Sequence, residues 1–132
     1  MWAMTTVGEI MSGSLLTVEP TLSLTEAARQ MDGRSVGAVL VFDSGKLAGI
    51  LTERDILRAV AAGNLDSASV GDWMTRDPET VEPSERASQA AALMIHGGFR
   101  HLPVLDGGEP VGIISIRDLV RVVIADESPR GA

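Results

Sequence analysis

Two short segments, Thr52–Asp55 and Ser115–Asp118, carry the same two reactive side-chain types at the same spacing. Each has a hydroxyl residue three positions before an aspartate, where an apolar stretch gives way to a helical pattern. Helix N-termini have unpaired N–H groups that attract anions. The hydroxyl could donate to a phosphate oxygen, and the carboxylate could accept from both hydroxyls of a ribose. These segments are therefore candidate ligand-binding sites.

The same spacing also has a purely structural interpretation. Ser/Thr-x-x-Asp forms a capping box, which stabilises a helix by about 0.5–2 kcal/mol without any ligand. The two roles are compatible, because a capping side chain can be shared with a ligand or displaced by it. The spacing by itself leaves both interpretations open.

An internal duplication with a constant offset of 63 residues organises the chain. Residues 7–12 recur at 70–75, residues 17–20 at 80–83, and residues 49–55 at 112–118. The alignment needs no gap, and two copies at this period indicate a doubled unit that buries its open face against its twin. The sequence therefore predicts a first repeat at 7–62, a connector at 63–69 and a second repeat at 70–125.

Hydrophobic periodicity predicts strand, helix, strand, strand and helix in each repeat. The elements expected in the first repeat are a strand at 15–18, a helix from Leu24, a strand at 36–42, a hairpin turn at 43–46, a strand at 47–51 and a helix from Asp55. Those expected in the second are a helix at 87–95, a strand at 99–105, a turn at 106–109, a strand at 111–114 and a helix at 118–125. Each hydroxyl–aspartate segment is thereby placed where a buried strand leads into a helix.

Four kinds of motif accompany the duplication: Glu9–Met11 and Asp72–Met74, the Thr-x-x-Pro strands at 17–20 and 80–83, the run Arg100–Asp106, and Gly-Ile-Leu-Thr-x-x-Asp or Gly-Ile-Ile-Ser-x-x-Asp at 49–55 and 112–118. On these motifs the chain resembles, over about residues 7–125, a tandem pair of CBS (cystathionine β-synthase type) domains. The resemblance implies an α/β (α+β) fold with two β-α-β-β-α repeats related by a pseudo-two-fold axis in one compact module. Such modules often dimerise and often bind adenine nucleotides in clefts between the repeats, where the hydroxyl contacts phosphate and the aspartate grips the ribose.

The two repeats differ in their basic residues. Arg100 and His101 stand at the start of a second-repeat strand, whereas the equivalent first-repeat positions hold glycine and alanine. In the CBS family this strand start carries side chains that face the phosphates, so we expect the site built on Ser115 and Asp118 to bind phosphate more tightly. Arg76 could reach the site built on Thr52 and Asp55. A solvated strand-end residue is the structural alternative for Arg100.

An adenine ring would require an apolar slot beside each site. Val36, Met11 and Gly13 could line the slot that reaches the second-repeat site. Phe99 and Met74 could line the other. Ordinary core packing is the alternative for most of these residues, since methionine and valine on buried strands need no ligand.

The composition excludes several classes of function. The net charge of −7 and an aromatic share of 3% without tyrosine argue against a nucleic-acid or anionic-membrane partner. The absence of cysteine excludes thiolate chemistry and fits a reducing, cytoplasmic location. No apolar stretch approaches the roughly 20 residues of a membrane helix, and the first residues lack a signal-peptide pattern. The two histidines, His96 and His101, do not share a helix face, so we expect no metal site, and no catalytic motif appears.

These observations lead to the hypothesis of a regulatory module rather than an enzyme. It would require no cofactor and would bind AMP, ADP or ATP, with NAD and S-adenosylmethionine as further candidates. Binding would shift a conformational equilibrium and signal to an unidentified protein partner. Apolar helix stripes predict a homodimer; they comprise Ile56, Leu57, Val60 and Ala61, and Leu119, Val120, Val123 and Ile124. The alternative is a ligand-free dimerisation scaffold in which the Ser/Thr-x-x-Asp segments are only caps.

Overall fold

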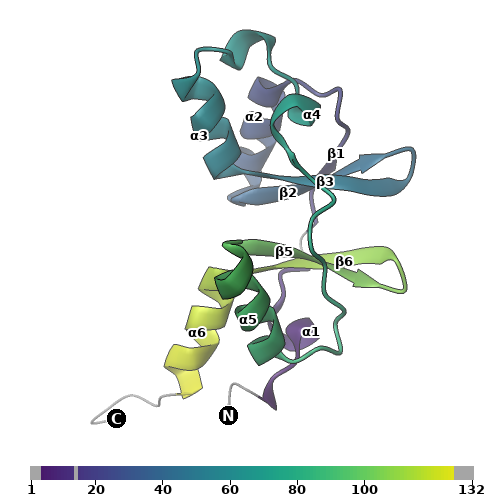
Figure 1. The fold of residues 1–132 in the computed structure, drawn as a ribbon, viewed down its shortest axis with the longest axis vertical. Helices are drawn as coiled ribbons and strands as arrows, with labels where there is room; N and C mark the ends of the chain where they lie inside the picture. The colour runs from purple at the N-terminus through teal and green to yellow at the C-terminus, as the bar shows by residue number, and fades with distance from the viewer. Residues whose placement is uncertain (1–3, 14, 127–132) are drawn as a thin grey trace. The chain divides into compact units, whose positions relative to one another are not determined.

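The computed structural model describes residues 4–13 and 15–126, which form two compact units (Figure 1). One unit runs from residue 15 to residue 78, and the other joins residues 4–13 to residues 79–126. The short helix α1 (Val7–Ile10) therefore belongs with the second repeat, and its counterpart α4 (Val70–Trp73) belongs with the first. The duplicated sequence is thus folded with its two N-terminal segments exchanged.

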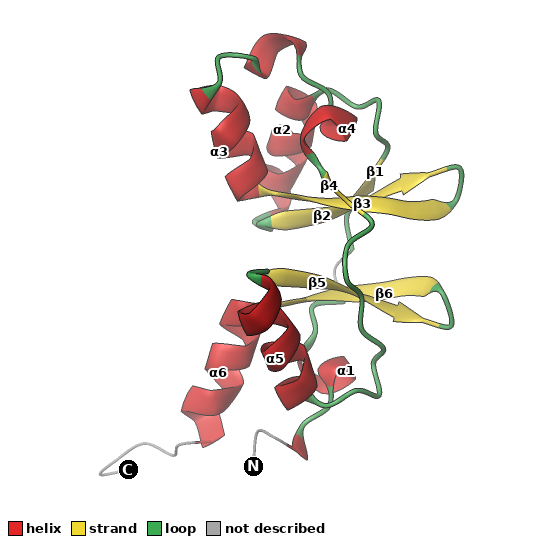
Figure 2. Ribbon diagram, viewed as in Figure 1, coloured by secondary structure: helices red, strands yellow, loops and turns green. Residues whose placement is uncertain are grey.

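The unit at 15–78 is a mixed sheet covered by helices. Its strands are β1 (Thr17–Val18), β2 (Ala38–Asp43), β3 (Lys46–Thr52) and β4 (Thr75–Arg76), in the spatial order β1-β2-β3-β4. Strand β1 pairs in parallel with β2, and the other two pairings are antiparallel. The helices α2 (Leu24–Arg34) and α3 (Glu53–Ala61) lie on one face of this sheet (Figure 2). A single 3₁₀ turn, η2 (Leu65–Ser67), precedes α4.

The core of this unit comes from the apolar positions that the periodicity singles out. Leu24, Ala27 and Met31 recur on one side of α2 and are buried, as helical spacing predicts. They pack with Val39 and Val41 of β2 and with further residues of the same cluster: Leu16, Val18, Leu51, Ala59, Ala68, Val70 and Met74. Ala68 lies in the segment predicted as a connector, so this segment contributes to the core of the first unit.

The other unit has the same plan with fewer strands among its described residues. Strands β5 (His101–Asp106) and β6 (Glu109–Ser115) form an antiparallel pair, with α5 (Ala87–Gly97) and α6 (Ile116–Asp126) on one face (Figure 2). Its core consists of Val7, Val81, Ala87, Ala90, Met94, Leu102, Val104, Ile114 and Leu119. Val7 is the first residue of α1, and its N–H donates to the carbonyl of Glu85 at 2.8 Å.

Two equivalent glycines allow the exchanged segments to approach the sheets. A Cβ on Gly49 would lie 2.5 Å from the Thr75 carbonyl oxygen and 2.8 Å from Met74 Sδ. A Cβ on Gly112 would lie 2.6 Å from the Ser12 carbonyl oxygen, in the same arrangement. No other residue type fits these positions without displacing the segment.

The predicted order of the four longer helices and the four longer strands is confirmed, while several boundaries differ for identifiable reasons. Strand β2 begins at Ala38, not at residue 36, because Ser35 ends α2 in the left-handed conformation and the Val36 N–H donates back to the Met31 carbonyl at 3.0 Å. Gly98 and Phe99 end α5 in the same way, so β5 begins at His101. The helices α3 and α6 begin two residues earlier than expected, directly after the residue that caps or precedes them.

The second repeat differs from the first at its initial strand. The first repeat forms the two-residue strand β1, and its counterpart is a single parallel bridge between Val81 and Val104. In the first repeat the Leu40 N–H donates to the Leu16 carbonyl at 3.2 Å. Pro103 occupies the equivalent position and has no N–H to donate, so the pairing stops at one residue.

Candidate functional site

The second-repeat site is a capped junction between β6 and α6. The Ser115 N–H donates to Asp118 Oδ2 at 2.9 Å, and the Asp118 N–H donates to Ser115 Oγ at 3.1 Å. These reciprocal bonds form the capping box that the spacing predicts. The Asp118 side chain is 20% exposed, so part of the carboxylate is accessible from solvent.

The first-repeat junction, between β3 and α3, has the same backbone arrangement. The Thr52 N–H donates to Asp55 Oδ2 at 2.9 Å, and the Asp55 N–H donates to Thr52 Oγ1 at 3.4 Å. A third bond distinguishes this junction, because the Thr52 hydroxyl also donates to Asp55 Oδ2 at 3.1 Å. The Asp55 side chain is 8% exposed, and among the described residues Asp55 is the buried charged residue. The cap interpretation therefore holds at both junctions.

The pairing of β5 with β6 brings the residues predicted for the second-repeat site together. His101 lies directly opposite Ser115 in the antiparallel pairing of β5 and β6. The Ile116 N–H donates to the Arg100 carbonyl at 2.9 Å, which holds the residue before β5 against the start of α6. The backbones of Arg100, His101, Ser115 and Asp118 thus lie close together, and we call these four residues the second-repeat constellation. Their side chains are a guanidinium, an imidazole, a hydroxyl and a carboxylate.

The first-repeat junction contains an acidic residue, Glu53, that was not among the residues expected to form the site. Ala38 lies opposite Thr52, and the Glu53 N–H donates to the Gly37 carbonyl at 2.9 Å. The Glu53 carboxylate lies over Gly37, with Oε1 3.4 Å from where a Cβ would be. Comparing the two repeats position by position would have identified it, because Glu53 aligns with Ile116.

An arginine accompanies each aspartate one turn further along the helix. Arg58 Nη1 lies 3.9 Å from Asp55 Oδ1, and Arg121 Nη1 lies 4.0 Å from Asp118 Oδ1. Both arginine side chains are well exposed, so solvent screening keeps these ion pairs weak. They place positive charge beside each aspartate, at the solvent-exposed side of the helix.

The remaining candidates lie in less direct positions. Arg76 pairs with Gly49 across β3 and β4, and its guanidinium donates to the Gly71 carbonyl at 3.2 Å. Val36 packs against the core of its own unit, and Phe99 packs against the core of the other. Gly13 is exposed, and apart from its chain neighbours no described residue has an atom within 4 Å of the position that a Cβ would take there.

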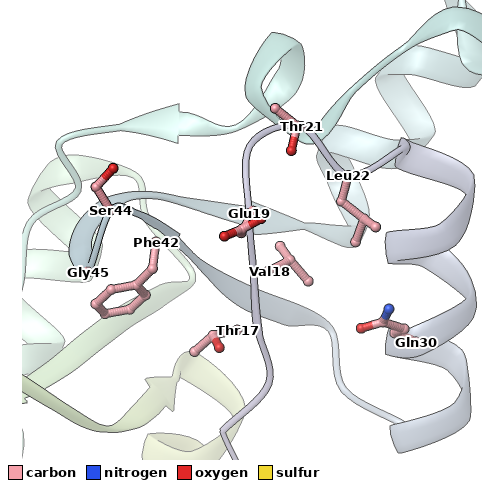
Figure 3. Close-up of a pocket in the computed structure, with 9 residues that line it drawn as sticks. All are labelled: Thr17, Val18, Glu19, Thr21, Leu22, Gln30, Phe42, Ser44 and Gly45. Carbon is pink, nitrogen blue, oxygen red and sulfur yellow. The ribbon is translucent and has the colours of Figure 1, made fainter.

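A separate cavity of about 450 Å³ lies in the unit at 15–78 (Figure 3). It is lined by Thr17, Val18, Glu19, Thr21, Leu22, Gln30, Phe42, Ser44 and Gly45. Phe42 and Ser44 come from the β2–β3 hairpin, and Gln30 comes from α2. None of the sequence-predicted site residues lines this cavity.

Residues 4–13 and 15–126 contain neither a metal-binding cluster nor a membrane-spanning helix. Within these ranges no group of three or more His, Asp or Glu side chains could hold a metal ion. None of the helices described there is long and apolar enough to span a bilayer.

Comparison with known proteins establishes the family. The family model for the CBS domain matches the chain twice, at residues 7–62 and 70–125. The chain belongs to the CBS domain family. An uncharacterised 17.7 kDa protein of Acidianus ambivalens is 37% identical over 122 residues, which cover 91% of this chain and 74% of that protein.

Solved structures of CBS domain proteins have the same fold. The structure of a putative signal-transduction protein with CBS domains from Burkholderia ambifaria MC40-6 superimposes with a TM-score of 0.88 at 38% identity, covering 97% of this chain and all of that one. The CBS domain pair of protein MJ0100, in complex with 5′-methylthioadenosine and S-adenosyl-L-methionine, has a TM-score of 0.87 at 28% identity and covers 93% and 98% of the two chains. CBSX2 in complex with AMP has a TM-score of 0.78 at 27% identity and covers 92% and 97%. The expected fold class, two α+β CBS repeats, is thereby confirmed.

Proposed function

We propose that this CBS domain pair is a regulatory module that binds an adenine-containing ligand at its capped strand–helix junctions. The constellation of Arg100, His101, Ser115 and Asp118 is the observation that carries the proposal. There a guanidinium and a helix N-terminus can hold phosphate, and a partly exposed carboxylate can accept from ribose hydroxyls. MJ0100 with its adenosyl ligands and CBSX2 with AMP support the choice of adenine compounds.

The chemistry of the junction is binding rather than bond cleavage. The Asp118 carboxylate uses Oδ2 for the cap, which leaves Oδ1 to accept from a ligand. A bound anion would add to the interactions of the α6 N-terminus and favour the conformation in which Arg100 and α6 are held together. We infer that this shift in conformational population is the regulatory signal, passed to a protein partner.

A thermal-shift assay with single-site variants tests this proposal. We expect the melting temperature of the wild-type chain to rise with at least one of AMP, ADP, ATP, NAD, S-adenosylmethionine and 5′-methylthioadenosine. Asp118→Ala or Asp55→Ala should abolish that rise. Asp72→Ala is the matched control, because Asp72 also accepts a cap hydrogen bond at a helix start but lies outside both junctions.

Absence of any shift with the whole panel would contradict the proposal and favour the ligand-free scaffold. That second candidate has its own support, since both capping boxes are complete without a ligand. It also draws on the exposed apolar side chains of α3 and α6, because Leu57, Val60, Val120 and Ile124 are each about half or more exposed. We infer from these side chains that the module forms a homodimer in either case. The cytoplasmic location and the absence of catalysis stay predictions.

A further inference from the structure

The two junctions have the same backbone geometry but different charges. In each, the first helical N–H donates at 2.9 Å to a carbonyl just before the adjacent strand, from Glu53 to Gly37 and from Ile116 to Arg100. The residue pairs that meet at this bond are therefore structurally equivalent. One pair consists of glutamate and glycine, and the other of isoleucine and arginine.

In the first-repeat junction the acidic side chain occupies the space that a side chain at position 37 would need. Glu53 Cδ and Oε1 both lie 3.4 Å from the position of a Cβ on Gly37. Its carboxylate therefore stands beside the strand start, and the chain has no cation at that strand position. In the second-repeat junction a guanidinium belongs to the strand start and the helix residue carries no charge.

Counting the charged residues within each junction and next to it on the adjacent strand and helix gives different totals. Glu53 and Asp55 balance Arg54 and Arg58, so the first junction is formally neutral. Asp118 alone opposes Arg100, Arg117 and Arg121, which leaves two positive charges at the second. Only the second junction therefore has enough positive charge to compensate two phosphate charges.

The hydroxyls of Thr52 and Ser115 also differ in a way that favours phosphate binding at the second-repeat junction. The Thr52 hydroxyl donates to Asp55 Oδ2 at 3.1 Å, so its proton is already used within the cap. At Ser115 the hydroxyl oxygen accepts from the Asp118 N–H, an arrangement that leaves the hydroxyl proton to donate to a phosphate. A ligand phosphate at Thr52 would have to break an existing bond and stand beside the Glu53 carboxylate.

Building on the proposed function, we propose that Glu53 is a specificity-determining residue that excludes phosphate from the Thr52–Asp55 junction. That junction takes an adenine nucleoside without phosphate, whereas the Ser115–Asp118 junction takes the phosphorylated nucleotide. The chain is thus a sensor of two chemically different adenine compounds. The discrimination comes from the Glu53 carboxylate in the first-repeat junction and from the Arg100 guanidinium in the second-repeat junction.

Isothermal titration calorimetry in a single-site background tests the inference. Asp118→Ala removes the second junction, and the remaining site should bind 5′-methylthioadenosine at least tenfold more tightly than AMP, by roughly the repulsion of two phosphate charges. Adding Glu53→Gln should tighten AMP binding by about fivefold at low salt and less at high salt, with 5′-methylthioadenosine unchanged. Asp32→Asn, which removes an exposed carboxylate from α2, is the charge-matched control and should change neither affinity.

The reciprocal change gives an independent arm if Asp118→Ala proves unstable. In an Asp55→Ala background, Ile116→Glu should weaken AMP binding at the remaining junction by about fivefold. Equal AMP affinity with and without the Glu53 charge, or two AMP molecules bound per wild-type chain with equal affinity, would overturn the inference and leave the proposed function intact. Failure of every adenine compound to bind the wild-type chain would overturn both.

Discussion

Gly49 and Gly112 show how much of this fold depends on single residues. Each lies where an exchanged N-terminal segment crosses a strand, and in each case a carbonyl oxygen lies too close to the position that a Cβ would take, at 2.5 Å for Gly49 and 2.6 Å for Gly112. Met74 Sδ and Met11 Sδ lie 2.8 Å from the same positions. Met11 and Met74, which the sequence suggested as lining for an adenine slot, therefore pack on these glycines.

Gly49→Ala is expected to lower the free energy of unfolding by about 1–3 kcal/mol, because the added methyl group must displace the Thr75 backbone. Gly33→Ala is the control, since Gly33 lies within α2 and has open space where a Cβ would be added. That change should raise the free energy of unfolding by about 0.5–1 kcal/mol. Urea denaturation of both variants measures the difference, and equal effects would contradict the packing argument.

Asp72 provides a pH-dependent prediction at the scale of one residue. The backbone N–H of Ser69 donates to Asp72 Oδ2 at 3.1 Å and is the main reason that the pKa of this carboxyl lies below its usual value of 3.8. The Ser69 hydroxyl and Arg76 lower the pKa further. A carboxyl with a lowered folded-state pKa stabilises the fold above its unfolded pKa, and this contribution is lost as the pH falls through the folded value.

A carbon-13 NMR titration of the side-chain carboxyl measures this pKa directly. The expected value lies below 3.8, and Arg76→Gln should leave it lowered because the arginine is the smallest of the causes. A folded-state pKa at or above 3.8 would contradict the assigned hydrogen bond.

At the scale of elements, the exchange of α1 and α4 separates the repeats of the sequence from the units of the structure. The repeat at 7–62 lacks Ala68, Val70 and Met74, which belong to the core of its own sheet. It also lacks β4, which pairs with β3 through Gly49 and Ile50. The unit at 15–78 contains all of these.

We therefore expect a fragment of residues 15–78 to fold and a fragment of residues 7–62 to be largely unfolded, although both include the same two long helices. Circular dichroism and amide-proton dispersion in NMR spectra distinguish the two outcomes. A well-folded 7–62 fragment with cooperative unfolding would contradict this prediction. It would show that the α4 segment is dispensable and that the sequence repeat, rather than the unit at 15–78, is the stable folding unit.

For the whole molecule, the apolar side chains left on α3 and α6 suggest association of the chain with itself. Leu57 is 66% and Ile124 is 65% exposed, while Ile56 and Leu119 on the same helices pack against the cores. Each predicted stripe therefore has an inner part that packs against the core of its unit. Only the outer, exposed part is available to a second copy of the chain. Exposed aliphatic side chains of this size favour an interface over solvent.

Light scattering coupled to size exclusion should give the mass of a dimer for the wild-type chain and a monomer for Leu57→Glu, because a charge buried in the interface is costly. Ile95→Glu is the control, since Ile95 is 73% exposed on α5, outside the two stripes. A wild-type monomer at working concentrations would contradict the homodimer, and equal dissociation by both variants would place the interface elsewhere.

The sequence by itself determined whatever depends on neighbours in the chain. The 63-residue offset, the capping boxes at Thr52 and Ser115, and the hairpin turns with positive φ at Gly45 and Gly108 are local signals, and the structure contains each of them. The expectation that Arg100 and His101 lie near Ser115 came from the resemblance to CBS domain pairs, and the offset showed that the first repeat lacks this basic pair.

Only the tertiary structure decided which unit each N-terminal segment joins and where the Glu53 side chain lies. Both depend on contacts between residues distant in the chain, such as Gly49 with Thr75 and Glu53 with Gly37, and no local pattern encodes these contacts. The loss of the second-repeat strand depends on both the sequence and the tertiary structure. The sequence shows Pro103, but its missing N–H matters only once the partner strand is known. Local chemistry therefore predicts the elements and the sites, while long-range packing determines how they are assembled.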